Sequence, residues 1–384
     1  MKHKKICIIT PYYPTRDNPT IYTFVDQLAC SMADDGNEIL VICPQSYYDA
    51  IRYNNERTIE KRTINNNRII VYRPLMMSYG KKKLPYFNSM TLTYSSFRRS
   101  VERVLISKGK NVDYLYGHFL SPAGLCVAEL GKKYLIPSFC AFGESSLWSI
   151  DYTSIERIKE KLALLNGIIA VSSYNREILL ENSLYDSERI EVIPNGCNSK
   201  LFFPRDKDES RDILKLPKDV MIGIFVGKFD ERKGSERVDA ATNGIEKLKM
   251  MYIGSGKRIP KGDNIIFCGK IDHDKLPIYL SASDFFILPT KAEGCCNAII
   301  EAMFCGLPII SSSGKYNDDI LTTGNSIRID PENISQMKCA VKKLLNNRTL
   351  REQMSLNSIR QAKQLRIDIR ARRIIKFMEK YSDK

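Results

Sequence analysis

The chain has 384 residues, of which 43% are hydrophobic and 27% charged, and its formal net charge is +15. This length is too great for one ordinary hydrophobic core and predicts two domains. No apolar run reaches the roughly 18 to 20 residues that span a bilayer, and the run after Lys5 is too short for a signal peptide, so we expect a cytoplasmic protein.

The 11 cysteines are scattered, which indicates a reducing compartment. The sequence has only three histidines, and this small number argues against a structural zinc site. The positive charge must attract an acidic partner, and nucleic acid, an anionic membrane and phosphorylated small molecules all qualify. Residues 72–99 mix lysine and arginine with aromatic residues and methionine. This mixture fits peripheral contact with an anionic bilayer, and it fits a solvated basic loop equally well.

In the first half of the chain, short apolar runs of strand length alternate with segments of helical period, as is typical of βα units and parallel sheets. A helix is expected over residues 24–34, where Phe24, Leu28 and Met32 form one apolar stripe that ends before Gly36. The expected strands of this half are 5–10, 38–43, 68–73, 113–117, 138–141 and 167–171.

A second series of strands begins after residue 173. We therefore predict an α/β fold of two doubly wound Rossmann-like domains that face a central cleft, over residues 1–174 and 175–364. The basic helix within 365–384 is expected to join the first domain, with 367–381 as its helical part. The expected strands of the second series are 190–193, 221–226, 249–253, 265–267, 284–288 and 307–311.

The most informative segment is 288–310, which reads as a strand end, a tight loop, a helix and a second strand. Glu293 precedes Gly294 in the loop, and Glu301 lies in the following helix. A helix N-terminus binds phosphate well, and ionised carboxylates accept hydrogen bonds from sugar hydroxyls. The spacing of two glutamates is common by chance, but in this context it predicts a nucleotide-sugar site.

A glycine-flanked basic loop follows the expected strand 221–226. Gly227 permits close approach of a ligand, and Lys228, Arg232 and Lys233 can neutralise a diphosphate. Two such bases and one helix end offer roughly 4 to 8 kcal/mol to a departing diphosphate, so we expect no metal ion. The segment 272–274, Asp-His-Asp, is interpreted as a helix cap instead of a metal site.

Further candidates follow other expected strands. His118 comes after strand 113–117 and is expected to hydrogen-bond a sugar hydroxyl or the acceptor, although a lone histidine is more often structural. Residues 142–145 are expected to line the cleft, and 254–256, Gly-Ser-Gly, to back the nucleotide. The segment 194–196, Pro-Asn-Gly, is interpreted as a tight turn.

Together these residues resemble the retaining glycosyltransferases of family 4, the glycosyl transferases group 1, which have the GT-B fold. The resemblance implies that Glu293 contacts the transferred sugar, that Glu301 contacts the ribose and that His118 contacts the sugar from across the cleft. It also implies that the enzyme retains configuration without a metal. The matching segments are 10–14, 36–38, His118, 171–172, 193–196, 203–204, 227–228, 232–234, Glu293 and Glu301.

The resemblance further implies that Lys228 and Lys233 hold the diphosphate, although arginine is commoner than lysine at position 228. The loop also departs from the usual Glu-Gly-Phe-Gly, in a form that resembles enzymes of bacterial capsule and lipopolysaccharide assembly. Residues 18–21 replace a common Gly-Gly pair, and Phe142 replaces a common histidine. The expected donor-binding residues are Glu301, Arg232, Gly294, Cys295, Cys296, Asn297 and Gly227.

We therefore expect transfer of a hexose or N-acetylhexosamine from a UDP- or GDP-sugar to a lipid-linked saccharide, at the inner membrane face, in cell-surface polysaccharide synthesis. A nucleotide-sugar 2-epimerase of the same fold is the alternative, and it would convert donor without acceptor. A basic nucleic-acid-binding protein is a third interpretation, but the chain has no recognition helix or aromatic RNA motif. We expect no cofactor, no metal and no nucleic-acid partner.

Overall fold

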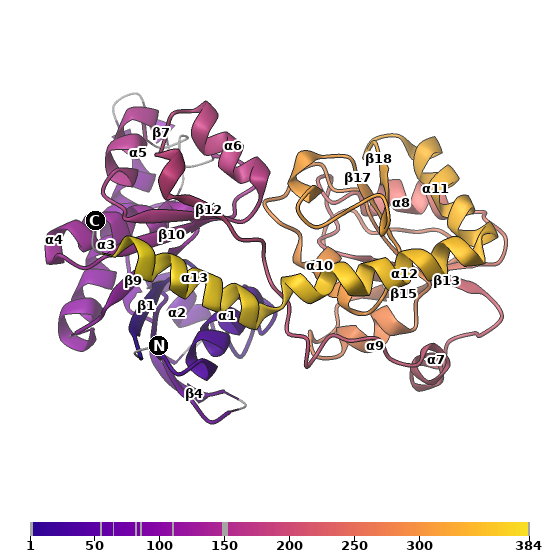
Figure 1. Ribbon diagram of the computed structural model, residues 1–384, viewed down its shortest axis with the longest axis horizontal. Helices are drawn as coiled ribbons and strands as arrows, with labels where there is room; N and C mark the ends of the chain where they lie inside the picture. Colours follow the sequence, from indigo (N-terminus) through magenta and orange to yellow (C-terminus); the bar gives the residue numbers. More distant parts are fainter. Residues whose placement is uncertain are drawn as a thin grey trace. The chain divides into compact units, whose positions relative to one another are not determined.

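The computed structural model describes residues 3–53, 56–63, 65–80, 83–84, 87–109, 111–147 and 153–382. The chain forms two compact units, one of Met1–Pro194 with Ile367–Lys384 and one of Asn195–Arg366 (Figure 1). Each unit is built on its own sheet. Residues 81, 82, 85 and 86 of the basic aromatic segment 72–99 lie outside the described residues, so the interpretation of that segment stays a prediction.

The first unit contains an eight-stranded sheet in the order β12-β11-β10-β9-β1-β2-β5-β4. All neighbours are parallel except β4, which pairs antiparallel with β5 at the edge. The strands are β1 (Lys5–Ile9), β2 (Glu38–Ile42), β4 (Thr58–Arg62), β5 (Arg68–Tyr72), β9 (Tyr114–His118), β10 (Ser138–Phe142), β11 (Gly167–Ala170) and β12 (Ile190–Val192). Two short pairs complete the strands of this unit: β3 (Gln45–Ser46) with β6 (Leu75–Met76), and β7 (Lys83–Leu84) with β8 (Phe87–Asn88).

The assignment of strand 190–193 to the second series was wrong, because β12 pairs in parallel register with β11 of the first sheet. The expected division after residue 174 is therefore replaced by one at Pro194 and Asn195. A short apolar strand carries no local mark of the sheet that it will join, since register depends on partners distant in sequence.

Alternating residues of β1 supply two separate cores, because successive side chains of a strand point to opposite faces. Ile6 and Ile8 pack with α1 and α13, whereas Cys7 and Ile9 pack with residues of α3, α4 and α5. The helices of this unit are α1 (Thr23–Asp34), α2 (Tyr47–Tyr53), α3 (Ser89–Lys108), α4 (Leu125–Tyr134), α5 (Ile155–Leu162), α6 (Ser173–Glu181) and α13 (Ile367–Tyr381).

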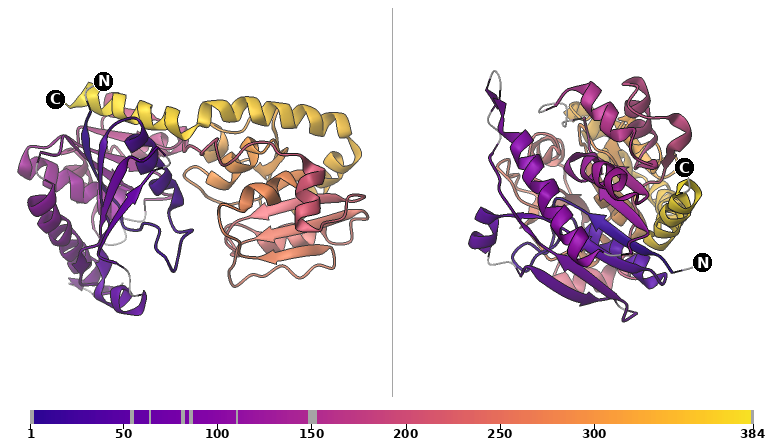
Figure 2. Two further views of the ribbon diagram at one scale, coloured as in Figure 1. Left: turned by 90° about the horizontal axis from the view of Figure 1, so that it is seen from below. Right: turned by 90° about the vertical axis from the view of Figure 1, so that its left-hand side faces the viewer.

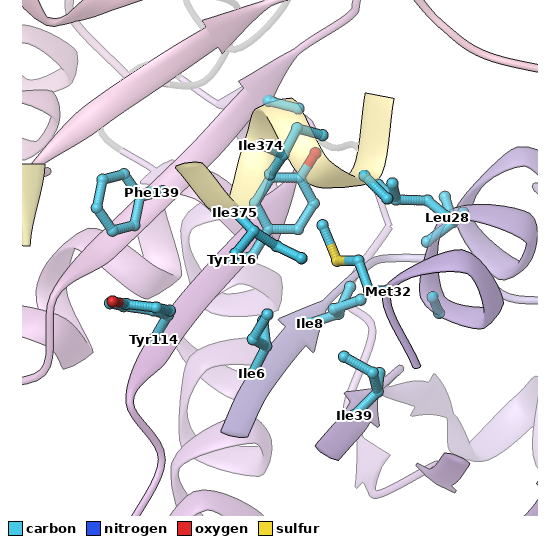
Figure 3. Packing of buried hydrophobic residues seen from close by; sticks show 14 of the residues in the cluster. Ile6, Ile8, Leu28, Met32, Ile39, Tyr114, Tyr116, Phe139, Ile374 and Ile375 are labelled. Carbon is cyan, nitrogen blue, oxygen red and sulfur yellow. The ribbon is translucent and has the colours of Figure 1, made fainter. Parts of the chain in front are cut away.

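The last helix, α13, confirms the expectation that the C-terminal segment returns to the first unit. It lies beside α1 (Figures 1 and 2). Its apolar face places Ile374 and Ile375 near Tyr116 and Leu28, in the core formed on one face of the sheet (Figure 3). Full burial of each such aliphatic side chain contributes about 1.5 to 3 kcal/mol, so α13 is an integral part of this unit.

The second unit contains a six-stranded, fully parallel sheet in the order β15-β14-β13-β16-β17-β18. Most of its central residues are buried, as expected for a parallel sheet covered on both faces. The strands are β13 (Met221–Val226), β14 (Leu248–Ile253), β15 (Ile265–Gly269), β16 (Phe285–Leu288), β17 (Ile309–Ser312) and β18 (Ser326–Ile329). The helices are α7 (Lys207–Leu214), α8 (Ser235–Thr242), α9 (Leu276–Ser281), α10 (Asn297–Phe304), α11 (Ile334–Asn346) and α12 (Arg348–Ala362).

Within the described ranges, none of the helices combines the length and apolar character that crossing a bilayer requires.

Candidate active site

The loops that follow β13 and β16 meet at the carboxyl edge of the second sheet. The two strands are neighbours, with Gly223 paired to Phe285. The backbone N–H of Lys291, after β16, donates to the carbonyl of Arg232, after β13, over 2.9 Å. The basic loop and the Glu293 loop, recognised separately in the sequence, are therefore joined in one structure at the edge where ligands of open α/β sheets bind.

Glu293 is the centre of this cluster. Its Oε1 accepts hydrogen bonds from Arg232 Nη1 (2.8 Å), Lys233 Nζ (2.5 Å) and Thr290 Oγ1 (2.7 Å). Burial alone would raise the pKa of the Glu293 carboxyl, but the charges of Lys233 and Arg232 outweigh burial and lower it. The carboxylate is thus ionised and fixed in orientation through Oε1, and no described residue donates to Oε2.

Lys228 differs from the other two cations. Its side chain is 70% exposed and its Nζ lies 3.9 Å from Asp230 Oδ2, outside the Glu293 cluster. Gly227 is held by close contact with the next loop, since a Cβ on Gly254, whose φ is +150°, would lie 1.9 Å from the Gly227 carbonyl oxygen. Gly254 therefore lets its loop pack closely against the basic loop. From the sequence it was expected only to back the nucleotide.

Glu301 lies on α10 and pairs with a residue that the sequence analysis did not connect to it. Its Oε1 is 2.8 Å from His273 Nε2, and the His273 ring packs on Phe202 with centroids 5.3 Å apart. Burial lowers the pKa of His273, but the hydrogen bond and charge of Glu301 reverse this effect and raise it. The neighbouring Asp272 pairs with Lys275 over 3.0 Å.

The segment between the two glutamates forms the entry to α10. Gly294, Cys295 and Cys296 are buried, and the Cys295 carbonyl accepts from Asn195 Nδ2 over 3.1 Å. Cys296 is the N-cap residue of α10 and has no side-chain oxygen to cap the helix; the N–H groups of Ala298 and Ile299 face its thiol, a weak acceptor that an anion can replace. Asn297 Oδ1 is buried without a partner among the described residues.

Three supporting residues of this edge escaped sequence reasoning. Thr290 fixes Glu293, as described above. Asp230 Oδ1 accepts from the Lys233 backbone N–H over 2.9 Å, and Arg237 donates to the Pro289 carbonyl over 3.0 Å. All three lie within or beside motifs that the sequence had singled out, and this proximity could have pointed to them. The sequence does not show which way their side chains point.

His118 belongs to the first unit and ends β9, whereas the residues described so far belong to the second. Its ring packs against Phe24 (5.4 Å), Tyr116 (5.9 Å) and Phe119 (4.9 Å), and its Nδ1 is buried without a partner among the described residues. Burial, assisted by the positive charge of Arg370, lowers the pKa of His118 to about 3. The imidazole is therefore neutral at physiological pH and can hydrogen-bond but not serve as a cation.

Glu144, at the end of β10, supports the chain that follows His118. Its Oε1 accepts from the backbone N–H groups of Leu120 (2.7 Å) and Ser121 (3.2 Å), and its Oε2 accepts from that of Gly143 (3.1 Å). Burial raises the pKa of Glu144 to about 7 despite these hydrogen bonds. From the sequence, residues 142–145 were expected to end a strand and line the cleft, and that lining stays a prediction; the support that the Glu144 carboxyl gives to Leu120 and Ser121 was not foreseen.

The Glu144 carboxyl makes stability depend on pH. Since its pKa rises from 4.5 to about 7 on folding, its stabilising effect is complete below pH 4.5 and is lost as the pH rises through 7. Relative to Glu144→Gln, the free energy of unfolding of the native protein is expected to fall by about 3 kcal/mol between pH 4.5 and 8. Urea denaturation of both proteins across this range measures the difference, and parallel curves would contradict the assignment.

Comparison with known families decides the class of the protein. Residues 22–201 match Glycosyltransferase Family 4, and residues 206–361 match Glycosyl transferases group 1. This chain belongs to the family 4 glycosyltransferases. The assignment confirms the resemblance carried by the basic loop and the Glu293 loop.

Relatives of this glycosyltransferase include a teichuronic acid biosynthesis glycosyltransferase of Bacillus subtilis, 24% identical over 80% of each chain. The phosphatidylinositol N-acetylglucosaminyltransferase gpi3 subunit of Schizosaccharomyces pombe is 23% identical over 76% of this chain and 62% of that one. Among solved structures, sucrose-phosphate synthase from Thermosynechococcus elongatus aligns with a TM-score of 0.78 at 20% identity, covering 98% of this chain and 99% of that one. Anabaena HepE in complex with UDP and glucose aligns with a TM-score of 0.72 at 14% identity, covering 98% and 100%. These similarities confirm the GT-B fold.

In the part of the chain that the structure describes, no group of three or more histidine, cysteine, aspartate or glutamate side chains is arranged to hold a metal ion. Independence from metals stays a prediction.

Proposed function

We propose that this glycosyltransferase moves a hexose or an N-acetylhexosamine from a UDP- or GDP-sugar to a lipid-linked saccharide, with retention of configuration and without a metal ion, in the synthesis of a cell-surface polysaccharide. The observation that carries the proposal is the convergence of Arg232 and Lys233 on Glu293 at the carboxyl edge of the second sheet. This cluster combines positive charge for a diphosphate with a fixed acceptor for sugar hydroxyls.

Lys233 and Arg232 can bind Glu293 and the diphosphate at the same time. An ammonium has three N–H donors and a guanidinium five, so Lys233 and Arg232 can keep their contacts with Glu293 while they donate to phosphate oxygens. Glu293 Oε2 then accepts from a hydroxyl of the transferred sugar, and Glu301, oriented by His273, accepts from the ribose. Lys228, whose side chain is exposed, contributes further positive charge near the diphosphate.

In the proposed reaction, the bond from the anomeric carbon to the diphosphate oxygen breaks, and a bond to the acceptor hydroxyl forms on the same face of the sugar. The acceptor proton passes to the oxygen of the departing diphosphate. Lys233 and Arg232 stabilise the charge that develops on this leaving group, which is the kind of fixed electrostatic contribution that dominates many enzymatic rate enhancements. His118, neutral and at the edge of the first sheet, is proposed to contact the transferred sugar.

Two kinds of relatives support the choice of donor and acceptor. Anabaena HepE has been crystallised with UDP-glucose, which favours a UDP-sugar as donor. The relatives from teichuronic acid biosynthesis and from the cps region of Klebsiella pneumoniae favour a cell-surface polysaccharide as product. We propose a cytoplasmic protein with peripheral contact at the inner membrane face, where a lipid-linked acceptor is presented.

Incubation of the purified protein with UDP-, GDP- and ADP-sugars tests the proposal. One nucleotide series is expected to raise the melting temperature, since a ligand at 100 times its dissociation constant adds about 2.7 kcal/mol. Release of the nucleoside diphosphate should then require a saccharide acceptor extracted from bacterial membranes. Epimerisation of the donor sugar in the absence of acceptor would contradict transfer, and steep salt-dependent binding of duplex DNA without donor binding would favour nucleic acid as the partner.

A further inference from the structure

Four aromatic side chains gather at the carboxyl edge of the first sheet, beside His118. Tyr12 follows β1, Tyr22 and Phe24 lie at the start of α1, and Phe119 follows β9. The centroid distances are 5.2 Å for Tyr12 and Tyr22, 5.4 Å for Tyr22 and Phe24, 5.2 Å for Tyr22 and Phe119, and 6.1 Å for Phe24 and Phe119. Because β1 and β9 are parallel neighbours, these segments share one edge.

Tyr22 and Phe24 pack against the core of the first unit, and the cluster continues from them to the surface. Tyr12 is 52% exposed, and Tyr22, Phe24 and Phe119 are only partly buried. Aromatic rings of this size are normally covered when they serve folding alone. A continuous, partly exposed group of rings instead indicates a binding surface.

The backbone beneath the rings is held in an unfavourable conformation. Tyr22 has φ 51° and Phe119 has φ 76°, values that bulky residues rarely adopt. Glu144 holds the chain immediately after Phe119 through the N–H groups of Leu120 and Ser121. Strain that the surrounding structure maintains in this way is concentrated at functional sites in proteins.

A polar group lies within the same cluster. The His118 ring packs against Phe24 and Phe119, and its Nδ1 is buried without a partner among the described residues. Buried side-chain nitrogens without a hydrogen bond are uncommon in native proteins. Because His118 is proposed to contact the transferred sugar, the partly exposed rings beside it lie next to that sugar, where a saccharide acceptor must approach.

We propose that Tyr12, Tyr22, Phe24 and Phe119 form an aromatic platform that stacks against one face of a pyranose ring of the acceptor. The C–H bonds on one face of a pyranose carry partial positive charge, and the faces of aromatic rings carry partial negative charge. The hydroxyls at the rim of the same sugar supply hydrogen bonds to polar groups beside the platform. This inference rests on the proposed glycosyl transfer and names the part of the acceptor that the first unit recognises.

The test uses the full chain and methyl glycosides of glucose, galactose, mannose and N-acetylglucosamine, with saturation-transfer difference NMR as the readout. The glycosides carry no lipid chain, so a signal reports the sugar itself. At least one of them is expected to bind the native protein. Its dissociation constant should rise about three- to tenfold in Tyr12→Ala and stay near the native value in Tyr12→Phe, which keeps the ring.

Tyr48→Ala is the matched control, because Tyr48 is a 67% exposed tyrosine of the same unit on α2, and it should leave glycoside binding unchanged. Equal binding by Tyr12→Ala and the native protein would overturn the proposal, as would the absence of any glycoside signal. A signal from 1-octanol with none from the glycosides would also overturn it and favour a lipid chain on this surface.

The same samples are titrated with UDP, GDP and ADP. Native protein that binds a nucleotide but no glycoside contradicts the platform and leaves the proposed function standing. Native protein that binds no nucleotide contradicts the proposed function itself, whatever the glycosides do.

Discussion

Glu293→Gln is expected to lower the rate of nucleoside diphosphate release by about 10²- to 10³-fold, the effect typical of losing one oriented electrostatic contact in a transition state. The neutral amide cannot match the charges of Lys233 and Arg232, which lie 2.5 and 2.8 Å from Oε1. It is also a weaker acceptor for a sugar hydroxyl. Steady-state assays with saturating donor and acceptor measure the loss as a change in kcat.

Glu246→Gln is the matched control, since Glu246 is an exposed glutamate of the same unit and should retain full activity. Thermal denaturation of the variants separates loss of turnover from loss of folding. If folded Glu293→Gln turned over at the native rate, the assignment of Glu293 to the transferred sugar would be wrong.

Asp284→Ala is expected to lower the free energy of unfolding by about 3 to 5 kcal/mol, because it leaves the buried Arg211 guanidinium without its counter-ion. The Arg211 and Asp284 side chains are 2% and 4% exposed, and Nη2 lies 2.7 Å from Oδ2. Asp284 also accepts from the Ile222 backbone N–H over 2.8 Å and from Lys207 over 2.8 Å. The carboxylate thereby ties β13 and α7 to the start of β16.

Hydrogen exchange of β13 and β16 peptides in the full chain measures this effect, since these amides report opening of the second unit. The double variant Arg211→Met with Asp284→Ala should cost less than the sum of the single changes, because the unpaired charge is then gone. Protection in Asp284→Ala equal to that of the native protein would contradict the role of the pair.

The sequence predicted those elements whose local pattern agrees with their tertiary role. Residues 367–381 form α13 within the expected bounds, and 221–226 form β13. The edge strand β4, Thr58–Arg62, was missed because its residues are mostly polar. Alternate residues of this strand are exposed and the others are only partly buried. β18, Ser326–Ile329, was missed because it is short and includes Arg328, whose guanidinium bonds the Ser312 carbonyl. In both strands, pairing overrides composition.

Some features of the candidate site could be predicted from the sequence and others could not. The convergence of Lys233, Arg232 and Glu293 followed from the rule that the carboxyl ends of parallel strands share an edge. The pairing of His273 with Glu301 did not follow, because 28 residues separate them and no periodicity links a loop residue to a helix face. The aromatic platform was hidden for a similar reason, since its rings come from three segments that only the sheet brings together.

A crystal structure of the full chain with UDP is the decisive test of the proposed donor site. The proposed site places the diphosphate within about 3 Å of Lys233 Nζ, beside the N-terminus of α10, and the ribose hydroxyls on Glu301. UDP bound elsewhere, with Lys233 and Arg232 still engaged by Glu293 alone, would contradict it.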